Sequence, residues 1–182
     1  CYLPFIDHFN YDEVLKFLNS SKPKDALQYD IVDLEQAFIS MTTVFVHTRQ
    51  NICLEYYYSM CLLYMRRVLE SSYQQVERQS VCQSFMLNRL SLFSVIAGCL
   101  VIKHTNDEGF FYYGVCESLS IQNRLLKRLE ILFLLIIDWN LSCEIDDLFE
   151  IGILVFYHTP INYGIVSKPS NIFCYEQLPI NL

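Results

Sequence analysis

Few residues of this chain have the types and spacing that catalysis or metal binding requires. The four histidines stand at positions 8, 47, 104 and 158. Their spacing, from one another and from the cysteines, is not that of a zinc site. The sequence also has no glycine-rich nucleotide loop and no Gly-x-Ser-x-Gly turn. We therefore predict no catalytic residue, no cofactor and no metal ion.

Two charged residues interrupt segments that are otherwise apolar. Lys103 follows the apolar stretch 90–102, and Glu130 stands among apolar residues at the offsets that share a helix face. An unpaired charge in such a place costs free energy. The lysine can reach past its helix end, the two residues can pair with each other, or Glu130 can pair with Lys127 or Arg128. The remaining alternative is an interface with a partner, where charges stay hydrated until the complex forms.

The elements that carry these residues are predicted to be helices. The chain has 182 residues, of which 53% are hydrophobic, so a single domain can bury a large core. All prolines stand before residue 24 or after residue 159, which leaves a long window without the strongest helix breaker. Apolar residues in this window recur at intervals of three and four. The fold class is therefore predicted to be all-α.

The apolar pattern divides the chain into helices and three regions. Long helices are expected at about Ile31–His47, Asn51–Glu70, Cys82–His104 and Ser120–Trp139, and shorter ones at Asp12–Asn19, Phe110–Tyr113 and Ser142–Tyr157. Asp30 is placed to cap the first long helix, and the polar stretch 71–80 is expected to be a loop. The third and fourth long helices are apolar nearly all round, which indicates central positions. The regions are an N-terminal flank (1–29), a main domain (30–142), and a C-terminal helix with an extended tail (143–182).

The net charge limits the classes of partner, and the cysteine pattern indicates the redox state of the compartment. The formal charge of −7 argues against nucleic acid or an anionic membrane surface as a partner. The apolar stretch 91–102 is too short for a transmembrane helix, which needs about 20 residues. The eight cysteines contain no Cys-x-x-Cys pair and most lie in apolar runs, so we expect buried free thiols in a reduced compartment. The expected location is nuclear or cytoplasmic.

Three segments together resemble the cyclin box, most closely that of the P-type or U-type (PHO-type) cyclins. They are Ile96–Glu108, Phe111–Tyr113 and Leu129–Leu141. The family pattern has a small-residue helix ending in Lys, an acidic pair, an aromatic segment, and a Leu-Glu-x-x-Phe-Leu helix ending in Asp-Trp/Phe-x-Leu. The resemblance implies a five-helix bundle around a central helix, with short flanking helices.

The resemblance also implies a partner and a binding face. Cyclins are regulatory subunits that bind and activate a cyclin-dependent protein kinase, and they perform no chemistry themselves. In the family, the Lys and Glu hydrogen-bond the kinase backbone, and by position these roles fall on Lys103 and Glu130. Asp107 corresponds to the acidic position after the Lys and is expected to shape the same face. Apolar contact area is expected from Phe110, Phe111 and Leu134.

The sequence departs from the family pattern at two places, and other functions stay open. The chain reads Tyr64-Met65-Arg66-Arg67 where cyclins generally have Asp-Arg, and Leu119-Ser120 where PHO-type members commonly have Gly-Gly. One alternative is a cyclin-fold adaptor or transcription-type module without a kinase. Another is a helical enzyme or ligand carrier with a core pocket near Trp139 and the tyrosines 56–58. The carrier requires a sizeable buried cavity, whereas a cyclin requires a packed core with an exposed apolar and charged face.

Overall fold

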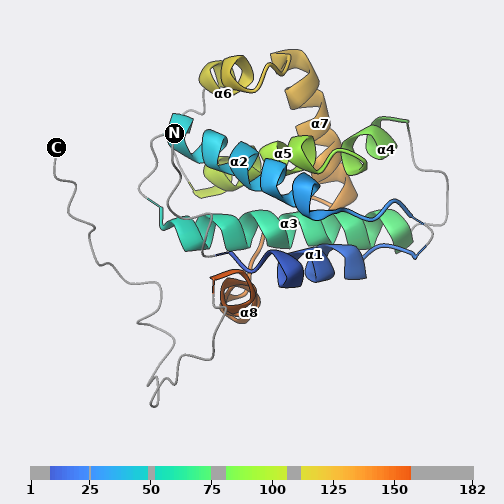
Figure 1. Cartoon of the computed structure of the whole chain (residues 1–182). Coiled ribbons are helices and arrows are strands. Elements are labelled where there is room, and N and C mark those ends of the chain that lie inside the picture. Colours follow the sequence, from blue (N-terminus) through green and yellow to red (C-terminus); the bar gives the residue numbers. More distant parts are fainter. Residues whose placement is uncertain (1–8, 25, 49–51, 75–80, 106–111, 157–182) are drawn as a thin grey trace, which may run out of the picture.

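The computed structural model describes residues 9–24, 26–48, 52–74, 81–105 and 112–156 (Figure 1). Over these ranges the chain forms eight helices and no strand, so the predicted all-α class is confirmed. The helices are α1 (Tyr11–Ser20), α2 (Ile31–Thr48), α3 (Leu54–Gln74), α4 (Val81–Leu87), α5 (Leu90–Thr105), α6 (Tyr112–Ser118), α7 (Asn123–Ile136) and α8 (Ile145–Phe156). The predicted tail after residue 156 lies outside the described residues.

The central helix is α5, which contacts α2, α3, α4 and α7. Its residues from Leu92 to Ile102 are all buried, as expected from a segment that is apolar all round. The one hydroxyl in this stretch, that of Ser94, donates to the carbonyl oxygens of Ala37 (3.1 Å) and Ser91 (2.7 Å). The small residue Gly98 lies directly against Tyr57 of α3. The helix is therefore closed in by its neighbours on every side.

The single helix predicted over residues 82–104 is wrong, because two helices replace it. The axes of α4 and α5 differ by 94° at the break between them. The backbone N–H groups of Asn88 and Arg89 donate to Ser84 (3.0 Å) and Met86 (3.2 Å), which closes the last turn of α4. Both Met86 and its neighbour Leu87 are buried in the core, so the bend lets the end of α4 pack against it. Within the described ranges no single helix is long and apolar enough to cross a membrane; α4 and α5 meet that test only as a bent pair.

Two other helices end at different places from those predicted. Helix α3 continues to Gln74, four residues into the predicted loop, and Ser72 in this extension is buried. Helix α7 stops at Ile136 instead of reaching Trp139, because Asp138 and Trp139 have left-handed backbones (φ 50° and 57°). Helix α7 is also not a second central helix. Its buried residues form only one face, and its opposite side is exposed.

The predicted flanks share the same core as the main domain. Helices α1 and α8 both contact α3, and Figure 1 shows them on one side of α3 with α5 on the other. The backbone N–H of Asn10 donates to the carbonyl oxygen of Val155 at 2.9 Å, which joins the two flanks directly. Buried residues of α8 include Leu148 and Ile151. The chain on both sides of the predicted main domain therefore helps to cover α3.

A reciprocal cap starts α2, as predicted from Asp30. The N–H of Asp33 donates to Asp30 Oδ1 at 2.8 Å, and the N–H of Asp30 donates to Asp33 Oδ2 at 3.2 Å. We expect Asp30→Ala to lower the free energy of unfolding by about 1 kcal/mol, because it removes the acceptor for a helix N–H. Urea denaturation measures the loss. Asp30→Asn keeps an acceptor and should cost much less; an equal loss in both variants would contradict the capping role.

Candidate functional site

Lys103 and Glu130 meet on the outer side of the bundle. Lys103 lies in the last turn of α5 and Glu130 in the middle of α7. Lys103 Nζ lies 2.7 Å from Glu130 Oε2, which makes both a hydrogen bond and an ion pair. The Lys103 side chain is 33% exposed, whereas that of Glu130 is only 6% exposed. Of the alternatives left by the sequence, the structure has the two residues paired with each other.

Tyr112, the first residue of α6, completes this charged cluster. Its hydroxyl donates to Glu130 Oε2 and accepts from the ammonium of Lys103. The ammonium groups of Lys103 and Lys127 lie 4.3 Å and 5.3 Å from the centroid of its ring. Tyr112 was not among the predicted site residues. Its position in the aromatic segment between Lys103 and Glu130 was the sequence feature that could have identified it.

The second carboxylate oxygen of Glu130 has no hydrogen bond from any residue that the structure describes. Oε1 is buried and makes no hydrogen bond to the described part of the chain. Burial raises the pKa of Glu130 above its usual value, and the hydrogen bond and charge of Lys103 and the charge of Lys127 oppose this rise. A buried oxygen without a partner is costly, because it has lost water and gained nothing in exchange. A donor brought by another molecule would recover that cost.

A groove of about 550 Å³ opens over the charged cluster. Its walls consist of Leu100, Lys103, His104, Tyr112, Lys127, Glu130, Ile131, Leu134, Trp139 and Leu141. The apolar part is open to the outside, since Ile131 is 53% exposed and Trp139 is 58% exposed. Trp139 is held by its backbone N–H, which donates to the carbonyl oxygen of Leu134 at 2.8 Å. An exposed apolar wall beside a buried charge is typical of a binding surface.

Part of the predicted site lies in the groove. Three of the six predicted residues line it: Lys103, Glu130 and Leu134. The other three, Asp107, Phe110 and Phe111, lie outside the described residues. Sequence reasoning missed Ile131 as a groove residue. Trp139 belongs to the cyclin-like segment Leu129–Leu141, but as a binding residue it was considered only in the alternative of a ligand carrier.

The tyrosines of that alternative belong to the packed core. Tyr57 and Tyr58 are buried, and the Tyr57 hydroxyl donates to the carbonyl oxygen of Met41 at 2.9 Å. The Tyr58 hydroxyl contacts Thr42. None of the tyrosines 56–58 lines the groove of Trp139. The pocket proposed between them is therefore not formed by these residues.

The cysteines of the described ranges are all free thiols. The expectation of burial is confirmed for Cys61, Cys99 and Cys116 and wrong for Cys53 and Cys82, which are exposed. Burial raises the pKa of both Cys61 and Cys99, so these thiols stay protonated and unreactive. Within the described ranges, no three His, Cys, Asp or Glu residues are placed to hold a metal ion.

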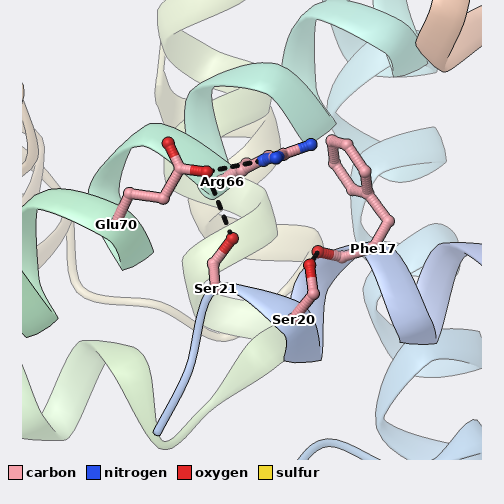
Figure 2. A network of polar contacts seen from close by, with 5 residues as sticks. All are labelled: Phe17, Ser20, Ser21, Arg66 and Glu70. Carbon is pink, nitrogen blue, oxygen red and sulfur yellow. Dashed lines mark hydrogen bonds and ion pairs between the residues drawn. The ribbon is translucent and has the colours of Figure 1, made fainter.

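The arginines at the first departure from the cyclin pattern make other contacts. Arg66 donates through Nε to Glu70 Oε1 at 2.7 Å, and its guanidinium lies 4.6 Å from the ring centroid of Phe17 in α1 (Figure 2). Arg67 donates through Nη1 to the carbonyl oxygens of Asn140 (3.3 Å) and Ser142 (2.5 Å). These arginines therefore connect α3 to α1 and to the segment before α8.

Comparison of the chain with protein-family models, with curated proteins and with solved structures finds no match. The resemblance to cyclins therefore stays a prediction from the motif residues.

Proposed function

We propose that the protein is a cyclin-like regulatory subunit that binds a cyclin-dependent protein kinase through the groove of Lys103 and Glu130. The observation that carries the proposal is the carboxylate of Glu130, which is buried and lies in an exposed apolar groove, and which pairs with described residues through one oxygen only. Neither catalysis nor a cofactor is part of this function. The expected setting is the nucleus or the cytoplasm.

The groove offers both kinds of contact that a protein backbone can use. Glu130 Oε1 can accept a hydrogen bond from a backbone N–H, and Lys103, whose side chain is partly exposed, can donate to a backbone carbonyl. The exposed side chains of Ile131 and Trp139 add apolar contact area beside this pair. Hydrogen bonds fix the register of the bound segment, and the apolar wall contributes most of the affinity.

The order of the helices supports the same proposal. Under this proposal, the five helices of a cyclin box would be α2, α3, α5, α6 and α7 in chain order; the central position of α5 supports this assignment. The short α4 is then an addition between the second and third helices, and α1 and α8 are the flanking helices. In this arrangement the lysine ends the third helix and the glutamate lies in the fifth, as in the family pattern.

Activation would follow from a difference in affinity between two states of the kinase. A subunit that binds the active arrangement of the kinase's mobile helix more tightly than the inactive one shifts the population toward activity. A shift from 1% to 99% active requires about 10⁴-fold tighter binding to the active state, or about 5.5 kcal/mol. An interface with one anchored charge pair and an apolar wall can supply a difference of this size.

The test is a charge exchange in the groove. We expect Lys103→Glu/Glu130→Lys to weaken binding to a purified cyclin-dependent kinase at least about 100-fold, because the kinase backbone then meets the wrong donor and acceptor. Binding and stimulated kinase activity are measured together. The exchanged residues can still pair with each other, and circular dichroism checks that the helical content is unchanged.

A matched control exchanges an ion pair of the same kind elsewhere. Glu13 and Lys16 form an exposed pair on α1 at 3.8 Å, so Glu13→Lys/Lys16→Glu should bind the kinase like the wild type. A further variant, Trp139→Asn, removes the exposed indole and keeps a residue that tolerates the left-handed backbone, and it should weaken binding. A folded wild type that binds no kinase would contradict the proposal and favour the adaptor without a kinase.

A further inference from the structure

A second pocket, of about 390 Å³, lies at the end of α1 against α3. It shares no residue with the groove of Lys103 and Glu130. Its walls consist of Ser20, Ser21, Lys22, Pro23, Arg66, Glu70 and Tyr73. This pocket plays no part in the proposed kinase binding, so the two sites can be tested separately.

Lys22 is the unusual residue of this pocket. Only 7% of it is exposed, and its ammonium makes no hydrogen bond to any described residue. The ammonium lies 3.5 Å from the ring centroid of Tyr29, a contact that replaces part of the lost hydration. Burial lowers the pKa of Lys22 to about 8, and the negative charge of Asp33 opposes this. The three N–H donors of this buried cation therefore have no acceptor among the described residues, and they reach a ligand in the pocket once the side chain turns away from Tyr29.

One oxygen of the neighbouring carboxylate of Glu70 is engaged by donors of the protein itself (Figure 2). The carboxylate of Glu70 accepts from Arg66 Nε at 2.7 Å and from the Ser21 hydroxyl at 3.5 Å. At the end of α1, the carbonyl oxygen of Phe17 accepts from the Ser20 hydroxyl at 2.8 Å. Two acceptors on this side of the pocket, Glu70 Oε1 and the Phe17 carbonyl oxygen, thus already accept from the protein itself.

The charges that line the pocket sum to a positive value. Lys22 and Arg66 contribute two positive charges and Glu70 contributes one negative charge, in a chain whose formal charge is −7. Arg66 uses Nε for Glu70, which leaves the Nη nitrogens of its planar guanidinium for a second anion. A pocket with a local positive charge in an acidic protein attracts anions.

We propose that this pocket binds a phosphate group, either as the free ion or as a phosphate monoester, between Lys22 and Arg66. The flexible stem of Lys22 lets its ammonium turn from the Tyr29 ring to the ligand. A phosphate monoester carries nearly two negative charges and several acceptor oxygens, which suits two cationic side chains better than a carboxylate does. Tyr73 on the pocket wall is placed to contact the organic part of a monoester.

The test is a titration of the full chain with inorganic phosphate. Binding is monitored by ³¹P NMR at constant ionic strength. We expect saturable binding to the wild type and at least about tenfold weaker binding to Lys22→Met, since the variant lacks one of the two cations. Arg66→Gln should weaken binding in the same way. The control is Lys24→Met, which removes an exposed lysine two residues away and should bind like the wild type. Circular dichroism checks the fold of each variant.

Two further titrations identify the ligand. The first uses phenyl phosphate in place of inorganic phosphate. A site for monoesters should bind phenyl phosphate more tightly than inorganic phosphate, whereas a site for the free ion should not. Acetate should bind at least about tenfold more weakly than either. The proposal is overturned if the wild type shows no saturable binding, if Lys22→Met binds phosphate as the wild type does, or if acetate competes equally.

Discussion

The substitution Gly98→Ala is expected to lower the free energy of unfolding by about 2–5 kcal/mol, because the added methyl group overlaps with a buried side chain. A Cβ at position 98 would lie 2.3 Å from the Tyr57 hydroxyl oxygen and 3.4 Å from Cζ of the same ring. Tyr57 is fully buried, and its hydroxyl donates to the carbonyl oxygen of Met41 at 2.9 Å. The ring must move, and the buried hydrogen bond breaks when it does. Urea denaturation followed by circular dichroism measures the change.

Two comparisons separate this clash from a general effect of alanine. Gly152 lies in α8, where a Cβ would meet only the Ser59 hydroxyl oxygen, at 3.6 Å. Gly152→Ala should therefore stabilise the protein by about 0.5–1 kcal/mol, as expected for alanine in a helix. Removing the hydroxyl with Tyr57→Phe should reduce the cost of Gly98→Ala. If Gly98→Ala costs the same with and without that hydroxyl, the close contact is not its cause.

The second large effect is a dependence of stability on pH that comes from Lys22. Burial lowers the pKa of Lys22 to about 8 in the folded protein, against 10.5 for an exposed lysine. Below the lower value both states carry the proton, and the folded protein bears the full cost of the buried charge. Between the two values the folded state releases the proton first, so the unfolded state binds more protons and the free energy of unfolding rises with pH.

The variant Lys22→Met isolates this contribution from the other titrating groups. At about pH 7 it should be more stable than the wild type, because an apolar side chain replaces a buried charge without a hydrogen bond. From about pH 7 to about pH 9.5 the wild type should regain about 2 kcal/mol relative to the variant. Phosphate must be absent from these buffers. A difference between the two proteins that stays constant with pH would show that Lys22 remains hydrated in the folded state.

The helices were predictable where local pattern and final packing agree. Helix α2 begins at Ile31 as predicted, because the cap of Asp30 and the apolar stripe mark the same start. The break between α4 and α5 was not predictable from periodicity, because apolar residues resume directly on both sides of the pair Asn88-Arg89 and the bend is determined by what they pack against. The extension of α3 to Gln74 has the same cause, since contacts with the core override a polar local sequence.

The candidate sites differ in how well the sequence predicts them. Lys103 and Glu130 stand out because each interrupts an apolar run, which is a property of the sequence itself. Lys22 carries no such signal: it lies in a stretch of serine, proline and lysine that is typical of an exposed turn. Its burial depends on Tyr29 and on the end of α3, which only the folded chain brings together. A polar residue in a polar stretch can therefore be identified as buried only from the structure.

The enclosure of α5 also bears on the order in which the chain becomes stable during synthesis. A ribosome releases α5 before α7, the element that covers its remaining side, and α7 itself ends at residue 136. Until then a helix that is apolar all round has one face open to water and to other nascent chains, and such a surface favours aggregation. Helix α3 likewise has only α1 on its outer side until α8 has been made. The part of the chain before α7 therefore cannot bury this apolar surface by itself until α7 and α8 have been made.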